Sequence, residues 1–351
     1  MCKNNIQINK TKKTIKSTIF YMFIVFVAFA FIIPLIYLTT TSFSSLIEVS
    51  DYPRQMFPSF SHNVEFSYDE TYERYVLARE NNKGEYVILN FGDEKNLSKY
   101  LEKNFNVFLE EDELLEIMLP AKETGEPIKV KLYKNIIANY IKFFETFDGV
   151  GEAFVNSIKA AIYTIILSLG IGGGLGYALA KTDIKGKQAI GVAALIVRMF
   201  PTIAISVSAA VMLIKFGMFD SMLGLAVIYA IPNIGLTAWI TRGIFMGVNK
   251  ELEEASLVFG ATKIKTFLKI TFPLVLPAFA ASSMYAFITA WNDTAVALLL
   301  TTNNKTLSLV LYEAIGGVNS IHYAAAGSIL LILPAAFFTF YLRKYINQLW
   351  G

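Results

Sequence analysis

The chain has few of the residues on which disulfide-stabilised and metal-binding domains depend. It contains one cysteine, Cys2, and two histidines among 351 residues. A single cysteine excludes an internal disulfide, and His62 and His322 have no partner at a metal-ligand spacing. The sequence therefore predicts no metal site, and we expect both histidines to be surface residues.

Charged residues are also scarce. They make up 17% of the chain, below the roughly 25% typical of soluble domains, whereas 54% of residues are hydrophobic and the mean hydropathy is +0.48. This composition indicates an integral membrane protein. A bilayer crossing needs about 20 apolar residues, and six runs reach that length with at most one charge, at 17–47, 160–180, 188–214, 221–241, 270–292 and 323–342. The first run is too long for a secretory signal and lacks a cleavage site, so we expect an uncleaved helix.

Basic residues set the expected orientation. They gather in residues 1–16, 181–187, 242–269 and 343–351, whereas the short loops on the other side carry few. Because short cytoplasmic loops are enriched in lysine and arginine, this distribution predicts that both termini lie in the cytoplasm.

Residues 48–150 differ from the rest, because they hold 20 of the 28 acidic residues. Residues 74–91 alternate like two strands around a turn, residues 94–105 have helical spacing, and residues 126–133 alternate again. We expect a small extracytoplasmic α+β insertion. It is either a docking surface for a soluble partner or a lineage-specific addition, and the sequence leaves both open.

A polar stretch, "EEASLVFGATKIKTFLKITFP" at residues 253–273, interrupts the apolar runs on the expected cytoplasmic side. It predicts two short amphipathic helices hinged at Gly260, since glycine adopts positive φ at helix ends without penalty. One interpretation is an interfacial helix whose lysines contact lipid phosphate. The other is a docking element, in which Ala255 and Ser256 permit close approach and Glu254 fixes the register. Physical arguments alone do not decide between them.

The spacing within this stretch closely resembles the EAA signature of ATP-binding cassette (ABC) importer permeases, Glu-Ala-Ala-x3-Gly-x9-Ile-x-Leu-Pro. The matching positions are Glu254, Ala255, Ser256, Gly260, Ile270 and Pro273. Ser256 replaces the second alanine, Phe272 replaces the leucine, and Phe259 stands where many members have aspartate. In that family the segment is the coupling helix, which sits in a cleft of the ATPase subunit and carries nucleotide-driven motion to the membrane helices.

Further landmarks extend the resemblance over most of the membrane part, including "YALAKT", "RMFP", "AWITRGIF", "AWND" and "AAAGSILLILP". They resemble carbohydrate permeases of the MetI-like, binding-protein-dependent family, most closely the maltose-type subunit. The implied fold is an all-α integral membrane protein with six transmembrane helices. Its expected parts are residues 1–47 with the first helix, the 48–150 insertion, and a five-helix core at 151–351 with the coupling helix at 250–273. The insertion, at about 62–134, has no recognisable counterpart in sequence.

The resemblance also implies the partners. They are a second homologous permease, two ABC ATPase subunits and an extracytoplasmic sugar-binding protein, together with membrane lipid and without nucleic acid. The chain would lie in a bacterial cytoplasmic membrane, without a cofactor and without catalytic residues, because ATP would be hydrolysed by the partner subunits. The expected substrate is maltose or maltodextrin, with another oligosaccharide or a sugar phosphate as alternatives.

A glycine-rich run, "SLGIGGGLGYALAK" at residues 168–181, fits neither nucleotide-binding glycine pattern, and no other stretch offers a Walker A motif. Its two small-x3-small pairs, Gly170 with Gly174 and Gly172 with Gly176, predict close helix packing instead.

Four residues are candidates for a substrate path. Arg198 lies within the third apolar run, where charge is costly; it either lines the path or pairs with a neighbouring subunit, and we favour pairing. Asp293 follows Trp291 and Asn292 at the outer end of the fifth run. These residues either bind sugar hydroxyls beside an aromatic platform or form an interfacial belt with a helix-end charge.

The sequence disfavours two other function classes. A secondary transporter needs acidic residues inside its spans to carry ions or protons, and no apolar core contains one. A receptor that senses through residues 48–150 needs a cytoplasmic signalling domain, and the expected cytoplasmic segments are too short for one.

Overall fold

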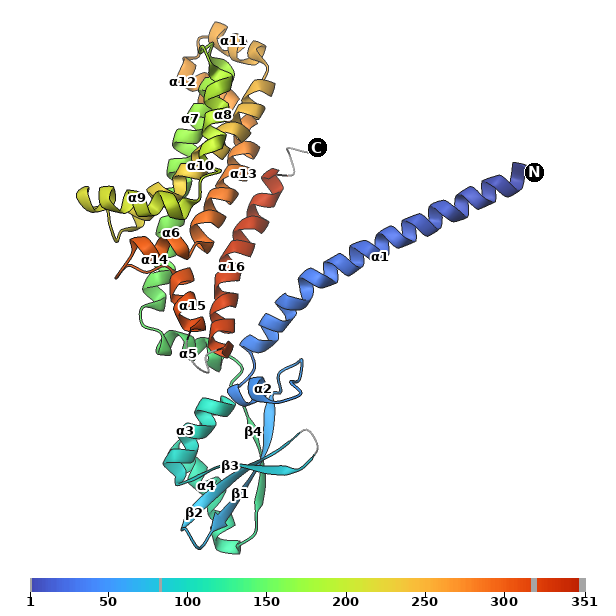
Figure 1. The fold of residues 1–351 in the computed structure, drawn as a ribbon, viewed down its shortest axis with the longest axis vertical. Helices are drawn as coiled ribbons and strands as arrows, with labels where there is room; N and C mark the ends of the chain where they lie inside the picture. The colour runs from blue at the N-terminus through green and yellow to red at the C-terminus, as the bar shows by residue number, and fades with distance from the viewer. Residues whose placement is uncertain (1, 82–83, 317–320, 347–351) are drawn as a thin grey trace. The chain divides into compact units, whose positions relative to one another are not determined.

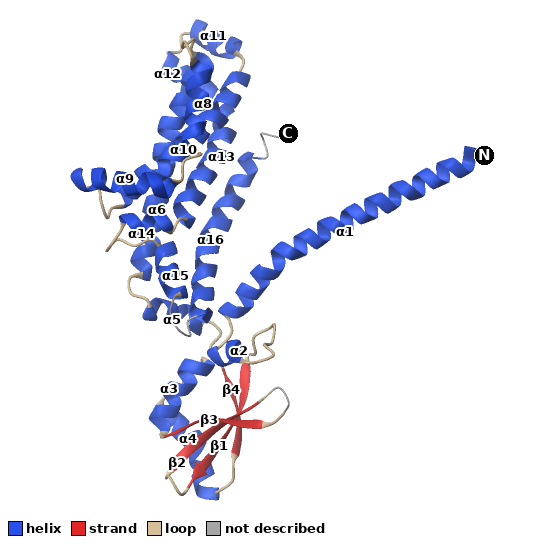
Figure 2. Cartoon of the chain, in the orientation of Figure 1, coloured by secondary structure: helices blue, strands red, loops and turns tan. Residues whose placement is uncertain are grey.

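The computed structural model describes residues 2–81, 84–316 and 321–346. The chain divides into two compact units, Met1–Phe143 with Val318–Ile329, and Phe144–Gly317 with Leu330–Gly351. Figure 2 shows that the described strands all lie in the first unit and that the second is helical.

The first unit begins with a long helix and continues into a small α+β domain. Its elements are α1 (Cys2–Ser42), α2 (Leu46–Ser50), β1 (Ser61–Asp69), β2 (Arg74–Glu80), β3 (Tyr86–Gly92), α3 (Glu94–Phe105), α4 (Glu111–Thr124) and β4 (Ile128–Tyr133). Helix α5 (Ala138–Thr146) follows. Residues 61–133 are called the sheet domain below.

The sheet domain is a four-stranded antiparallel sheet in the order β3-β2-β1-β4, with the helices α3 and α4 against one face. Alternation along β1 directs Val64 and Phe66 toward the helices, where they are fully buried. The core continues through Leu101 and Leu114 of the two helices and Leu132 of β4. The domain therefore buries a hydrophobic core of its own.

Most of this domain follows the sequence patterns. The predicted strands within 74–91 are β2 and β3, the predicted helix at 94–105 is α3, and the alternation at 126–133 gives β4. Asp93 caps α3 by accepting a hydrogen bond from the backbone N–H of Asn96. Strand β1 and helix α4 were not predicted.

The second unit consists of helices, several of them long enough to span a membrane (Figure 1). Its elements are α6 (Val150–Leu167), η1 (Ser168–Gly172), α7 (Gly173–Lys181), α8 (Lys187–Val197), α9 (Thr202–Lys215), α10 (Met222–Gly247), α11 (Lys250–Val258), α12 (Lys263–Thr266), η2 (Phe267–Thr271), α13 (Phe272–Asn292), α14 (Ala295–Leu300) and α15 (Leu307–Ile315). Helix α16 (Ile321–Ile346) begins in the first unit and ends in the second. The segments η1 and η2 are π-helical turns that continue into α7 and α13.

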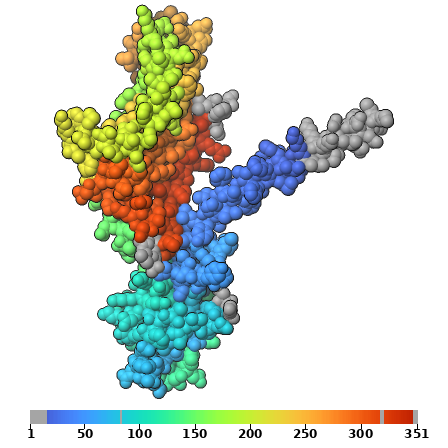
Figure 3. Space-filling view, in the orientation of Figure 1, coloured from blue at the N-terminus to red at the C-terminus, as the bar shows by residue number. Residues whose placement is uncertain are grey.

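Five described helical segments pass the length and hydropathy test for a span. They are Lys16–Ser42, Val150–Lys181, Met222–Gly247, Lys263–Asn292 and Ile321–Ile346. The predicted run at 188–214 is a bent pair of helices, α8 and α9, which meet at 91° and give a sixth span if the pair crosses the membrane together. Pro201 at the break cannot donate a backbone hydrogen bond and disfavours helical geometry at the residue before it. Helix α9 accordingly projects from the other helices of its unit in Figures 1 and 3.

The glycine-rich run packs through one of its two predicted pairs. A Cβ atom on Gly172 or Gly176 would collide with the backbone and side chains of α10, so these residues allow α7 and α10 to approach closely. The prediction for Gly170 and Gly174 is wrong within this chain, since no heavy atom lies within 4 Å of a Cβ built on either residue. The two pairs point in different directions because they lie two residues apart on the helix.

Candidate functional site

The polar stretch forms the predicted pair of short helices, α11 and α12, separated by a turn at Gly260. Asn249 begins α11 by accepting a hydrogen bond from the backbone N–H of Glu251, at 3.0 Å. Gly260 has φ +84°, which is the conformation expected of a glycine just beyond a helix end. Thr262 begins α12 by accepting from the backbone N–H of Lys265. The hinge is therefore set by two polar caps and one left-handed glycine.

The tip of the helix pair is apolar and exposed. No residue of α11 is buried, and Val258 and Phe259 are 85% and 91% exposed. Glu254 and Ala255 of the signature are also exposed. Aromatic residues are enriched at protein–protein interfaces, so the exposed ring of Phe259 makes this tip a candidate contact surface.

Glu253 attaches the other side of α11 to the membrane helices. Its carboxylate lies 3.3 Å from Lys181 Nζ, at the end of α7, and accepts a hydrogen bond of 2.7 Å from the Thr271 hydroxyl of η2. Lys181 also donates to the backbone carbonyl of Val248, at 3.0 Å. Because both charged side chains are largely shielded from solvent, this polar tie joins three segments that are distant in sequence.

The remaining signature residues have internal positions. The hydroxyls of Ser256 and Thr266 are 2.9 Å apart, so they link α11 to α12. Ile270 lies in η2, and Pro273 is the second residue of α13, directly after that π-helical turn. Sequence analysis singled out these residues but missed Glu253. The signal for it was the glutamate pair at 253–254 combined with a lysine closing an apolar run.

Aromatic side chains pack beneath the helix pair. The ring of Tyr177 on α7 meets the rings of Phe245 on α10 and Phe267 on η2 at 5.2 and 5.3 Å between centroids. Phe279 of α13 packs edge-on against Phe245. Such edge-to-face contacts add specific geometry to apolar burial, so α7, α10 and α13 meet at one aromatic cluster below α11 and α12.

The four predicted path residues do not form one site. Arg198 is exposed at the end of α8, with its guanidinium 5.9 Å from the Tyr285 ring. Trp291 is fully buried, stacks on Phe287 and donates from Nε1 to the carbonyl of Leu331 at 2.8 Å. It is therefore neither an open platform for a sugar nor an interfacial belt residue within this chain.

Asn292 and Asp293, which follow Trp291, lie in different environments. Asn292 is exposed and lines a cavity of about 740 Å³ between α13 and α16. Asp293 instead accepts hydrogen bonds from the backbone N–H of Val296 and from the Tyr229 hydroxyl, at 2.8 and 3.2 Å. Its carboxylate thus caps the start of α14, which is a structural use of the residue.

Asp220 organises a loop that sequence analysis did not single out. Its carboxylate accepts backbone hydrogen bonds from Thr302, Asn303 and Asn304, and its own N–H donates to Leu300. Burial alone would raise its pKa, but the three backbone donors outweigh burial and lower the pKa. The turn before α10 is therefore fastened to the loop after α14.

Both histidines are buried, so the prediction that they are surface residues is wrong. His62 lies inside the sheet domain, edge-on to Phe105 and with Nε2 3.9 Å from a Glu48 carboxylate oxygen. His322 is 1% exposed near the start of α16, where its ring lies against Tyr323. Single histidines have no sequence periodicity that would reveal burial. Among the described residues there is no group of three or more metal-ligating side chains.

A buried ion pair lies beside His62. Lys134 Nζ is 2.6 Å from Glu48 Oε2, and Glu48 also accepts backbone hydrogen bonds from Ser45 and Ser59. Burial alone would raise the Glu48 pKa, but Lys134 and the Ser45 N–H outweigh burial and lower it. Burial lowers the His62 pKa to about 4, although Glu48 opposes this shift. His62 is therefore neutral near pH 7.

The arrangement of helices, the exposed helix pair and its attachment to the bundle define a class of membrane transport subunit. The chain belongs to the family of binding-protein-dependent transport system inner membrane components, whose sequence profile matches residues 149–350. It is a membrane-spanning permease of the MetI-like type, as the signature predicted.

Relatives of this chain carry names of sugar uptake systems. The trehalose/maltose transport system permease protein MalG of Thermococcus litoralis is 27% identical over 219 residues, which are 61% of this chain and 79% of the relative. The trehalose transport system permease protein SugB of Mycobacterium tuberculosis is 29% identical over 210 residues, which are 57% and 74% of the two chains. A putative ABC transporter permease of Streptomyces antibioticus is 29% identical over 204 residues, which are 57% and 89%.

A solved structure shares the fold over nearly the whole chain. It is a chain of a bacterial ABC transporter involved in the import of the acidic polysaccharide alginate, with a TM-score of 0.62 and 17% identity. The likeness covers 94% of this chain and 96% of that one. Since 94% of this chain is covered, the likeness includes most of the residues that precede residue 149, where the family profile begins. The insertion thus has a structural counterpart that sequence comparison did not reveal.

Proposed function

We propose that this chain is the permease subunit of an ATP-driven importer for maltose, a maltodextrin or a related oligosaccharide. The names of the relatives support a sugar as substrate, since they include trehalose, maltose, maltodextrin and diacetylchitobiose systems. The observation that carries the proposal is the exposed tip of α11 and α12, held by a polar tie to the membrane helices.

The coupling role belongs to residues 250–273. Glu254, Ala255 and the tip residue Phe259 face outward and are available to an ATPase subunit. Ser256 joins the two short helices, and Gly260 sets their angle. Ile270 and Pro273 lead into α13, so a displacement of the pair reaches that helix directly. We propose alternating access, in which this displacement rocks the membrane helices and opens a central path.

The partners follow from the same proposal. They are a second homologous permease, two ABC ATPase subunits that hydrolyse ATP, and an extracytoplasmic sugar-binding protein. The basic loops support a location of α11, α12 and both termini in the cytoplasm of a bacterial cell, which leaves residues 48–150 outside and the core at 151–351. Arg198 and Asn292 remain candidates for the path or for contact with the second permease, since both are exposed within this chain.

The experiment compares two glycines that share a backbone conformation. Gly260 and Gly186 have φ +84° and +77°, and neither has a heavy atom within 4 Å of a Cβ position. Aspartate at either site meets a similar conformational cost, but only Gly260→Asp alters the α11–α12 turn. The complex is purified from native membranes with each variant, and sugar-stimulated ATP hydrolysis is measured.

We expect an ATPase subunit to copurify with the wild type and with Gly186→Asp, and to be lost or uncoupled in Gly260→Asp. The stimulating sugar identifies the substrate. If no ATPase associates with the wild type, or if both variants behave alike, the coupling assignment is wrong.

A further inference from the structure

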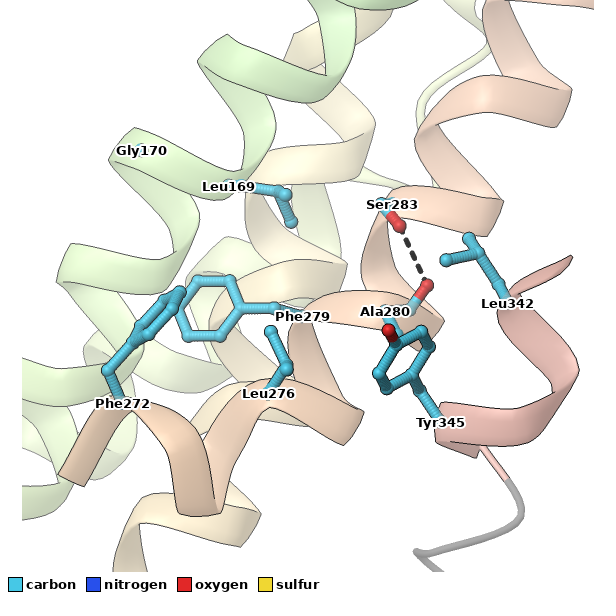
Figure 4. Close-up of a pocket in the computed structure, with 9 residues that line it drawn as sticks. All are labelled: Leu169, Gly170, Phe272, Leu276, Phe279, Ala280, Ser283, Leu342 and Tyr345. Atoms are coloured by element: carbon cyan, nitrogen blue, oxygen red, sulfur yellow. Dashed lines mark hydrogen bonds between the residues drawn. The ribbon is translucent and has the colours of Figure 1, made fainter. Parts of the chain in front are cut away.

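Two adjacent cavities lie along the helical unit and are together called the groove below. The first, called the lysine pocket, has a volume of about 640 Å³ and lies between α7 and α12, with Lys263 on its wall. The second, called the serine pocket, has a volume of about 530 Å³ and lies between α13 and α16, with Ser283 on its wall (Figure 4). Both are lined by Leu169, Gly170, Phe272 and Phe279, so the two cavities are adjacent.

The glycine pair that does not pack against a helix forms the floor of the groove. Gly170 and Gly174 line the lysine pocket, and space remains open beyond each of them. Both π-helical turns also border the groove, η1 through Leu169 and η2 through Leu268. Isolated π-turns are rare and occur often at functional sites. Both π-turns and both open glycines thus border the same cavities.

The groove is apolar along most of its length. Ser283 donates its hydroxyl hydrogen to the carbonyl of Ala280, which leaves little polar surface in the serine pocket (Figure 4). From Phe272 to Ser283 helix α13 rises about 16 Å at 1.5 Å per residue. One leaflet of a bilayer has a hydrocarbon depth of about 15 Å, half of the core thickness. The apolar part of the groove thus matches one acyl chain in length.

Positive charge lies beside the lysine pocket on α12 and η2, and Arg343 and Lys344 of α16 flank the serine pocket. Lys263, Lys265 and Lys269 are exposed on α12 and η2, and within the described ranges none of them belongs to an ion pair. The nearby α11 carries Glu251, Glu253 and Glu254. Glu253 is already engaged by Lys181 and Thr271, and the other two are exposed. Lys263 differs from Lys265 and Lys269 because it alone lines the groove.

We propose that this groove is a binding site for one anionic phospholipid. An acyl chain fills the serine pocket and the glycine floor, and the phosphate of the headgroup lies at Lys263. The site adjoins the polar tie of Glu253 and the start of α13, so an occupying lipid contacts the segment that connects the helix pair to the bundle. The proposal does not depend on the transported substrate, because the binding is measured directly.

Native mass spectrometry of the detergent-purified complex tests the site. The probes are 1-palmitoyl-2-oleoyl phosphatidylglycerol and the corresponding phosphatidylcholine, titrated separately. Lys263→Gln is compared with Lys265→Gln, which removes the same charge from the same helix outside the groove. Gly174→Leu fills the floor and is compared with Gly243→Leu, where the Cβ also meets open space. Circular dichroism and size-exclusion profiles verify that each variant is folded.

We expect the wild type to retain one phosphatidylglycerol more tightly than phosphatidylcholine. A lysine near a membrane surface contributes about fivefold to the affinity for anionic lipid, so Lys263→Gln should lose about that factor for phosphatidylglycerol alone. Gly174→Leu should weaken both lipids, and the two controls should match the wild type. Equal losses in Lys263→Gln and Lys265→Gln would mean diffuse surface attraction and would overturn the proposal. Crosslinking of Gly174→Cys to a partner polypeptide in membranes would also overturn it, because a protein helix would then occupy the groove.

Discussion

The sheet domain and the membrane helices bury their apolar residues in different ways. In the sheet domain, Leu97, Leu101 and Phe105 of α3 are fully buried against the sheet. Along α1, by contrast, large apolar side chains from Ile19 to Tyr37 are almost all exposed, and none of the helix's apolar window is buried within the chain. The sheet domain is thus stabilised by water exclusion from its own core. Helix α1 depends on lipid for the same burial, whereas α10 and the segment Lys263–Asn292 bury more than half of their apolar stretch within the chain.

The largest effect is expected from a mutation in the core of the sheet domain, which should leave the membrane helices folded. Leu101→Ala should destabilise it by about 2–5 kcal/mol, because the mutation removes transfer free energy and leaves a cavity. Leu333→Ala on α16 should have little effect, since Leu333 is 58% exposed. Hydrogen exchange of the full chain in nanodiscs distinguishes the two variants. In Leu101→Ala, protection should fall across residues 61–133 and stay unchanged across α10 and α13. Loss of protection in both units would show that they unfold together.

Acid should also destabilise the sheet domain. The His62 pKa of about 4 in the folded chain lies below 6.5, so between these values the unfolded state binds a proton that the folded state does not. Stability therefore falls as the pH drops from 6.5 to 4, by up to about 3 kcal/mol. Glu48, whose pKa is lowered, adds a loss in the same direction at lower pH.

Histidine NMR signals measure this directly, because the chain has only two histidines. His322→Gln assigns the resonances, and His62→Asn should flatten the pH dependence of exchange protection in the sheet domain. A His62 titration midpoint near 6.5 would contradict the burial argument.

An intermediate effect concerns the polar tie. Glu253→Gln removes one charge of a shielded pair, which should cost about 1–3 kcal/mol. If the tie positions α11, ATP hydrolysis should persist while sugar uptake falls. The exchange variant Lys181→Glu with Glu253→Lys should restore uptake in part, whereas Glu251→Gln, on the exposed side of α11, should behave as wild type. Parallel loss of ATP hydrolysis and uptake would indicate a merely structural role.

The smallest effect is expected where two charges meet in solvent. Lys305 Nζ and a Glu313 carboxylate oxygen are 2.8 Å apart, but both side chains are more than a third exposed. Exposed pairs of this kind contribute about 0.2–1 kcal/mol. Glu313→Gln should therefore change the thermal unfolding temperature of the complex very little. A change as large as that of Glu253→Gln would mean that Glu313 is buried in the complex, although it is exposed within this chain.

Sequence patterns predicted the elements that depend on local rules. The hinge at Gly260, the helix of 94–105 and the strands within 74–91 follow from caps, turns and periodicity. Features that depend on contacts distant in sequence were missed. Glu253 meets Lys181 across 72 residues and Asp220 meets the loop at 302–304, and neither pairing leaves a periodic signal. Nothing in the sequence around Trp291 indicates its complete burial either, since a sugar platform and an interfacial belt would both leave the ring accessible.

The tie between Glu253, Lys181 and Thr271 has a mechanical consequence. Apolar side chains in contact resist compression, but they separate with little resistance once water can enter. An ion pair supported by hydrogen bonds also resists extension, because separation leaves charges shielded from solvent without partners. If α11 follows an ATPase subunit, the membrane helices are drawn back by its retreat as well as displaced by its approach, so both halves of the cycle can be driven.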